Sequence, residues 1–469
     1  MKLRSRLLGL ALPAVLLVPT LHADGLAHGL SDAARRYARD YAMAMAHGSV
    51  PSFSRQTGLA CSACHTAFPH LTQFGRLFKL NGYTMTSLQV VKAGDSGKRE
   101  SLKLDLIPPV SAMVMTSFTQ TAKAQPGTQN GTVQFPQQLS LFFGEAITPR
   151  IGTFLQITYD PASGTIGMDN ADIRFANRTT VGSKSLIYGL TLNNNPTVQD
   201  VWNTVPAWRF PYASSAVAPS PAAATIIDGQ LGQQAAGLGA YGFLDNHLYG
   251  EVSAYRSAVQ GGHQLADAAA TNTIHGVGPY WRAFWYQPIG RQELMIGALG
   301  MSTSVFPKGV TGIRNRFTDI GFDAQYELPV GEGKGGITAH AIYVHEKQTL
   351  AADFANDAAT NPTNTLNTFR IDAAAYTPAR MGLTVGYFST SGTTDPLRYP
   401  EGSVGGSATG SPNSNGVIFE LSALPWLNTR FELQYVMYNK FNGANTNYDG
   451  SGRNAKDNNT LYLMSWVAF

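Results

Sequence analysis

The chain has 469 residues, of which 43% are hydrophobic and only 14% are charged. Soluble domains carry about 25% charged residues, while the mean hydropathy of -0.11 is too polar for a bundle of membrane-spanning helices. The formal net charge is +4, and three of the basic residues open the chain, so the remainder is near neutral and no nucleic-acid partner is expected. Abundant Gly, Tyr, Asn and Thr favour strands joined by polar turns.

Residues 1–23 have the pattern of a secretory signal peptide. The basic residues at its start are Lys2, Arg4 and Arg6. The apolar stretch Leu7–Val18 follows, and Leu21-His22-Ala23 resembles a cleavage site. A retained membrane anchor is the alternative, but the apolar stretch is shorter than the ~20 residues of a spanning helix. The sequence therefore predicts export from the cytoplasm.

The two cysteines stand in Cys61-Ser62-Ala63-Cys64-His65, the attachment pattern of c-type haem. Thiols at this spacing can each add to one vinyl group of a single porphyrin, and His65 can then ligate the iron. The alternatives are a disulfide, a redox dithiol and half of a zinc site. The zinc site would lack its second pair of ligands, and no thioredoxin-like pattern surrounds the motif. One covalent haem c, held by Cys61, Cys64 and His65, is therefore expected.

Aromatic and basic residues flank this motif and suggest a pocket for the porphyrin. Phe68 is a candidate wall, and Arg55, Arg76 and Lys79 are candidate partners for the two propionates. The alternative for each residue is a small hydrophobic core with solvated charges.

The distal ligand of the iron is open among several residues. Met85 is the first candidate, because it lies well downstream of His65 and Met ligation would raise the reduction potential. His70 is too close to the motif to reach the opposite face easily. His340 or His345 could reach in from the C-terminal part of the chain.

From residue 105 to the C-terminus, short segments alternate between apolar and polar residues and are separated by Gly, Asn, Pro and Asp. In Phe431–Tyr438, for example, the apolar residues alternate with Glu432 and Gln434. About sixteen such segments, each near the ten residues of a tilted spanning strand, predict a transmembrane antiparallel β-barrel. A soluble sandwich or propeller would also alternate, but a terminal strand that closes on Phe469 favours an outer-membrane barrel.

The run from Pro51 to Tyr83 resembles the fused cytochrome–porin family of outer-membrane iron oxidases. The residues that carry the resemblance are the haem motif, Pro51-Ser52-Phe53-Ser54-Arg55-Gln56-Thr57-Gly58 before it, and Phe68-Pro69-His70-Leu71-Thr72-Gln73-Phe74-Gly75-Arg76 after it. The family's architecture implies a small α-helical monohaem cytochrome c domain over 24–104 and a barrel of about sixteen strands over 105–469. A helix-like segment, 31–46, is not part of the family's pattern.

The resemblance also implies a function and a location. The protein is expected in the outer membrane of a Gram-negative bacterium, where it would oxidise extracellular Fe(II). The electrons would pass to a periplasmic carrier such as a soluble cytochrome c or a cupredoxin. Two alternatives remain, a diffusion porin whose haem domain is a structural plug and a haem enzyme similar to a peroxidase.

Overall fold

The computed structural model describes residues 51–85, 93–94, 101–102, 110–161, 164–258, 271–330 and 335–469. The predicted signal peptide and the helix-like segment 31–46 lie outside these residues. Within the described residues, none of the helices has the length and apolar character needed to cross a membrane.

The N-terminal segment 51–85 is built from short elements. They are α2 (Ser52–Thr57), α3 (Cys61–Cys64), the paired strands β1 (His65–Ala67) and β2 (His70–Leu71), and α4 (Gln73–Leu80). α4 begins after Thr72, whose hydroxyl accepts a hydrogen bond from the Gly75 backbone N–H, as an N-cap residue does. A second pair of short strands, β3 (Ala93–Gly94) and β4 (Ser101–Leu102), follows in the chain.

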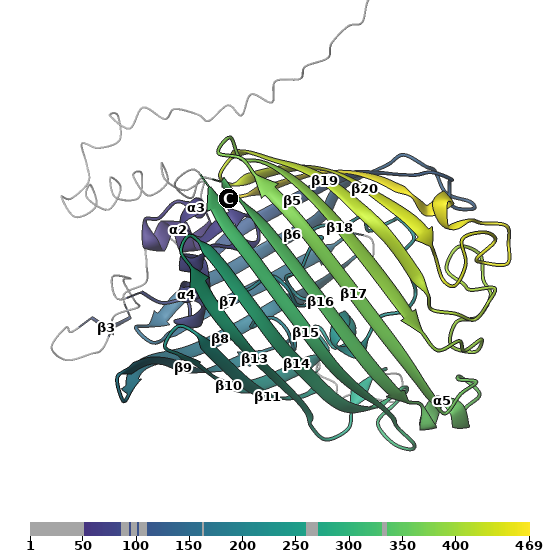
Figure 1. The fold of residues 1–469 in the computed structure, drawn as a ribbon, viewed down its shortest axis with the longest axis horizontal. Coiled ribbons are helices and arrows are strands. Elements are labelled where there is room, and N and C mark those ends of the chain that lie inside the picture. The colour runs from purple at the N-terminus through teal and green to yellow at the C-terminus, as the bar shows by residue number, and fades with distance from the viewer. Residues whose placement is uncertain are drawn as a thin grey trace, which may run out of the picture. The chain divides into compact units, whose positions relative to one another are not determined.

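Sixteen long antiparallel strands form a closed barrel, and the last strand pairs with the first (Figure 1). The strands are β5 (Val110–Thr121), β6 (Thr132–Thr148), β7 (Ile151–Asp160), β8 (Thr165–Val181), β9 (Lys184–Asn193), β10 (Ala235–Leu244), β11 (Leu248–Ser257), β13 (Gly278–Ile289), β14 (Gln292–Phe306), β15 (Asn315–Val330), β16 (Gly335–Thr349), β17 (Thr363–Tyr376), β18 (Met381–Gly392), β19 (Ser414–Trp426), β20 (Thr429–Lys440) and β21 (Thr460–Ala468). Short elements accompany them: β12 (Thr273–Ile274), which pairs with β14, η3 (Ile226–Gln230), α5 (Ala351–Ala355) and η4 (Ala455–Asn458). The predicted mainly-β barrel is confirmed.

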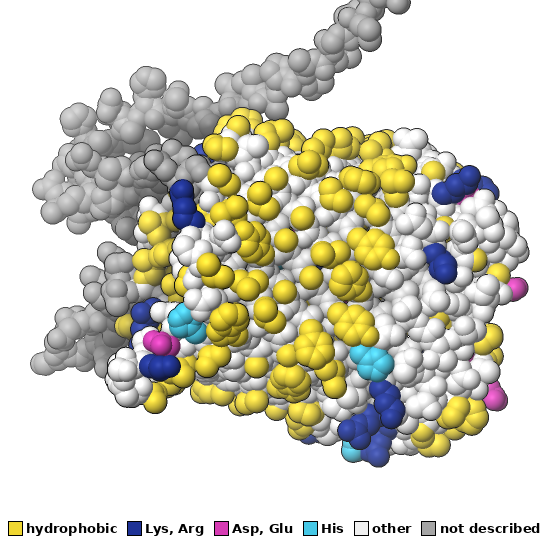
Figure 2. All heavy atoms as spheres, viewed as in Figure 1, with side chains coloured by type: hydrophobic (Ala, Val, Ile, Leu, Met, Phe, Trp, Pro, Cys, Tyr) yellow, Lys and Arg dark blue, Asp and Glu magenta, His cyan; other side chains and the backbone are white. Residues whose placement is uncertain are grey.

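The predicted alternation decides which side chains face outward. In β20, Phe431 and Leu433 are 45% and 39% exposed, whereas Glu432 and Gln434 are buried inside the barrel. Apolar side chains cover the visible outer face of the strands (Figure 2). Since an outer surface this apolar is not stable in water, the barrel requires a lipid surrounding.

The two ends of the barrel differ in their connections. At one end the strands are joined by short turns, such as 149–150 and 182–183. At the other end they are joined by long segments, such as 393–413 and 441–459. The chain closes the barrel at the short-turn end, where Ala112 and Phe469 exchange two backbone hydrogen bonds of 2.6 and 2.8 Å. In outer-membrane barrels the short turns are periplasmic and the long loops extracellular.

Candidate haem-binding site

The two thiols of the motif lie on one turn of helix. Cys61 begins α3 and Cys64 ends it, and His65 continues in an extended conformation. Cys61 is buried, Cys64 is half-buried, and the two are not joined in a disulfide. Burial, with a smaller contribution from neighbouring Cys61, raises the pKa of Cys64 to about 11. Because the two cysteines share one helical turn and no disulfide joins them, both thiols are available to one ligand beside the helix.

The imidazole of His65 is held by two contacts. Its Nδ1 lies 3.3 Å from the carbonyl oxygen of Pro69, and its ring stacks on Phe68 with centroids 4.0 Å apart. Burial lowers the pKa of His65 to about 4, so the ring is neutral. A proton on Nδ1, donated to the carbonyl, leaves the lone pair on Nε2, which is the arrangement of a metal-ligating histidine.

A cavity of about 460 Å³ lies beside the motif, within the range of roughly 300–1,000 Å³ for cofactor sites. Cys61, Cys64 and His65 all line it. Its aromatic wall comes from the N-terminal segment, the barrel strands and the connection between β9 and β10, and consists of Phe53, Phe68, Phe78, Tyr83, Phe142, Phe154, Trp208, Tyr212 and Trp466. Two thiols, one neutral imidazole and an apolar wall suit a covalently attached haem in their chemistry.

The predicted pocket residues do not all reach this cavity. Phe68 and Lys79 line it, but the Lys79 ammonium already donates to the carbonyls of Val198 and Asp200, at 2.6 and 2.8 Å. Burial lowers the pKa of Lys79 to about 7. Arg55, expected at a propionate, donates to the Val110 carbonyl. The structure therefore gives Lys79 and Arg55 backbone partners where the sequence suggested propionates.

Arg76, a candidate partner for a propionate, instead pairs with carboxylates of the barrel. Its guanidinium is buried and forms ion pairs with Glu293 and Glu327 on the barrel wall, with an N–O distance of 2.9 Å to Glu327. It also lies over the Trp202 ring, 4.5 Å from the centroid. Arg76 thus fastens α4 to the inner wall of the barrel instead of facing the cavity.

The methionines of the cavity wall were missed in the sequence. Met113 and Met115, both buried on β5, line the cavity, whereas Met85 packs against Phe78 and Tyr83 and is not among its lining residues. His345 is on the outward-facing set of β16. A signal was present in the sequence, because Met113 and Met115 on β5, like Met464 and Trp466 on β21, stand at inward positions where a barrel interior is usually polar.

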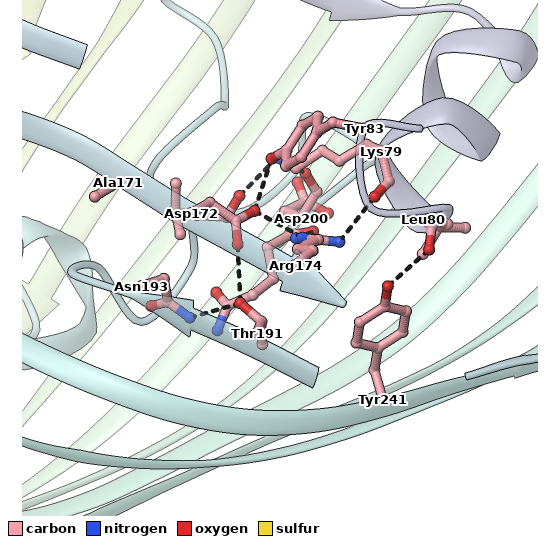
Figure 3. A network of polar contacts seen from close by, with 12 residues as sticks. Lys79, Leu80, Tyr83, Ala171, Asp172, Arg174, Thr191, Asn193, Asp200 and Tyr241 are labelled. Carbon is pink, nitrogen blue, oxygen red and sulfur yellow. Dashed lines mark hydrogen bonds and ion pairs between the residues drawn. The ribbon is translucent and has the colours of Figure 1, made fainter. Parts of the chain in front are cut away.

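Buried polar contacts join α4 and the following turn to the barrel (Figure 3). The Tyr83 hydroxyl donates to Asp172 at 2.7 Å, and the same carboxylate pairs with the fully buried Arg174 at 2.7 Å. The Tyr241 hydroxyl donates to the Leu80 carbonyl at 2.7 Å. Because each buried charge has a partner, burying these groups costs little folding free energy. The contacts thereby fix the position of α4 and the following turn.

A second segment fills the barrel interior. Residues 194–234 connect β9 to β10, and Val201, Trp202 and Val205 of this connection are buried. Asp200 of this segment pairs with Arg282 of β13 at 2.9 Å, and the Ile227 backbone N–H donates to Asp319 of β15 at 3.0 Å. The segment is therefore an internal plug, anchored to inward-facing charges of several strands.

The position of Gly75 shows how closely the elements near the motif approach each other. A Cβ at Gly75 would lie 2.3 Å from the Cys64 carbonyl oxygen. No side chain fits there, so glycine is required where α4 crosses the end of α3.

The fold is that of an outer-membrane β-barrel. The barrel is closed, its outer face is apolar, its interior is polar and plugged, and it has short turns at one end and long loops at the other.

Among solved structures, the chain is similar to OprB of Pseudomonas putida at 10% identity, with a TM-score of 0.46 over 77% of this chain and 93% of that one. It is also similar to OmpT of Vibrio cholerae (10% identity, TM-score 0.42, 77% and 98%) and to an anion-selective porin from Comamonas acidovorans (12% identity, TM-score 0.42, 77% and 98%). No family model and no curated protein matches the chain.

Proposed function

We propose that this outer-membrane barrel is an electron-transfer protein that carries one haem c on Cys61 and Cys64. In this proposal it takes electrons from extracellular Fe(II) and passes them to a periplasmic carrier, such as a soluble cytochrome c or a cupredoxin. The observation that carries the proposal is that Cys61, Cys64 and His65 line a single cavity of cofactor size at the short-turn end of a plugged barrel. A porin for diffusing solutes has no need of two thiols and a histidine beside a cavity of cofactor size.

The residues around the cavity have distinct tasks in this proposal. When bound, a c-type haem supplies one-electron redox chemistry. Cys61 and Cys64 tether it, and His65 supplies Nε2 to the iron while the Pro69 carbonyl fixes the ring. The aromatic wall keeps water from the macrocycle. Met113 and Met115 line the same cavity and would be the candidates for a second ligand of the iron.

A column of aromatic rings links this cavity with the long-loop end. From the cavity outward it consists of Tyr212, Phe210, Phe388, Tyr438, Phe441 and Tyr448. Phe210 and Phe388 share one apolar cluster, and the centroid distances of the other neighbouring pairs fall from 5.9 Å at Tyr212–Phe210 to 4.7 Å at Phe441–Tyr448. Packed rings avoid water-filled gaps, so the column supports a route for electrons across the barrel.

The decisive experiment adds Fe(II) outside intact cells that produce the protein and follows the haem absorbance. Prompt reduction, absent in a His65→Ala variant, is the expected result. If only a periplasmic reductant reduces the haem, inward electron flow from extracellular Fe(II) is ruled out. A haem that no donor reduces would favour a porin with a haem-bearing plug. A five-coordinate spectrum with peroxide turnover would favour a peroxidase-like enzyme.

The distal ligand can be tested with three matched variants, Met113→Leu, Met115→Leu and Met85→Leu. Leu keeps the volume and apolarity of Met but cannot ligate iron. Loss of a Met ligand is expected to lower the reduction potential by on the order of 100 mV and to remove the far-red absorption band of Met-ligated ferric haem. One of the two β5 variants should show both changes while retaining covalent haem. The same changes in Met85→Leu alone would instead establish Met85 as the ligand.

A further inference from the structure

A cluster of basic side chains lies on the outer face of the barrel at the long-loop end. Arg316 at the start of β15 and Lys347 near the end of β16 are exposed, and the residues next to them in the chain, Asn315 and Glu346, are buried inside. Arg316 pairs in register with Thr349, and Lys347 with Thr318. The two residues are therefore diagonal neighbours on the sheet, a spacing of about 7–8 Å that both side chains can bridge.

This cluster marks the border of the apolar outer surface. On the same two strands, Ile320, Phe322 and Tyr343 are 47%, 60% and 39% exposed and face outward. Figure 2 shows Lys, Arg and His side chains gathered beyond the apolar residues on the visible face, without Asp or Glu among them. This border is the depth at which acyl chains give way to lipid headgroups.

The cations at this border have no carboxylate partner among the described residues. Arg314, which is exposed just before β15, belongs to the same group. None of these three cations lies within 4.0 Å of a carboxylate oxygen of the described residues. Among the described residues, the side-chain hydrogen bonds of Arg316 go to the Ser302 hydroxyl, at 3.3 and 3.4 Å. The acidic residues of these strands, Asp319, Asp323, Glu327 and Glu346, all face inward.

We propose that Arg314, Arg316 and Lys347 bind the phosphate groups of the glycolipid that forms the outer leaflet of the outer membrane. Guanidinium groups bind phosphate oxygens in a bidentate manner, and Lys347 adds a point charge. The acyl chains of the same lipid lie along Ile320, Phe322 and Tyr343. The long-loop end faces the extracellular leaflet, where this lipid resides. The proposal does not depend on the haem or on electron transfer.

The test measures binding of lipid A carrying two phosphates to the purified full-length protein in detergent, by native mass spectrometry. The patch variant is Arg314→Gln/Arg316→Gln/Lys347→Gln. The matched control removes three exposed cations from the short-turn end, as Arg150→Gln/Arg291→Gln/Lys184→Gln. Heat-modifiable migration on a gel confirms that each barrel is folded. The patch variant is expected to bind at least about tenfold more weakly than the natural sequence, and the control equally well.

Three further probes identify what the patch recognises. Dephosphorylated lipid A should bind weakly to all forms, and phosphatidylglycerol should not compete effectively. Millimolar inorganic phosphate should leave the lipid bound, because the acyl chains contribute to binding. Equal lipid A binding by the patch variant, equal binding of the dephosphorylated lipid, or displacement by inorganic phosphate would each overturn the proposal.

Discussion

Replacement of both Cys61 and Cys64 with Ala is expected to abolish covalent haem completely while the barrel still assembles. The thiols are the only groups of the motif that can form thioether bonds, and both line the cavity. The barrel should persist because its closure depends on strand pairing between β5 and β21, outside the motif. Haem-dependent peroxidase staining of a denaturing gel measures the first effect, and heat-modifiable migration measures the second.

Two controls separate loss of attachment from general damage at the motif. The single variants Cys61→Ala and Cys64→Ala each keep one possible thioether and should retain reduced staining. Ser54→Ala removes a hydroxyl 3.5 Å from the Cys61 sulfur but leaves both thiols, and should stain normally. Covalent haem that survives in the double variant would overturn the assignment of the cofactor.

Replacement of Arg76 with Met is expected to release the N-terminal segment from the barrel wall. Arg76 is 2% exposed and is the partner of both Glu293 and Glu327. Met keeps much of the side-chain bulk, but two carboxylates are then left in a poorly solvated site without their cation. Breaking a buried ion pair in this way costs about 3–5 kcal/mol. Hydrogen exchange of residues 73–80 should therefore accelerate strongly, with little change in the strands of the barrel.

The same pair of carboxylates provides the control for this variant. In Arg76→Met/Glu293→Gln/Glu327→Gln no uncompensated charge remains, so much of the protection of α4 should return. A single Arg76→Met variant with natural exchange rates in α4 would contradict the anchoring role of this ion-pair network.

The sequence alone determined the barrel and its membrane-facing surface. Strand side chains alternate strictly between two faces, so an apolar outer set is visible without any tertiary information. The exposed residues of β20 are those that the alternation selected. The final strand was also recognised, although Tyr462, Met464 and Trp466 made its second face unusually apolar. The structure explains this anomaly, because these residues face the interior near the cavity.

Only the tertiary structure decided what lies inside the barrel. Alternation identifies the inward side chains but not their partners, since partners such as Arg76 and Glu327 lie far apart in the chain. Closure brings β21 beside β5, and thereby places Trp466 and Met115 on one wall with His65. For the same reason the sequence suggested a propionate as the partner of Arg76, whereas the structure pairs Arg76 with Glu293 and Glu327. Likewise, the place of residues 194–234 inside the barrel depends on the inward-facing Arg282 and Asp319, which lie on strands far along the chain.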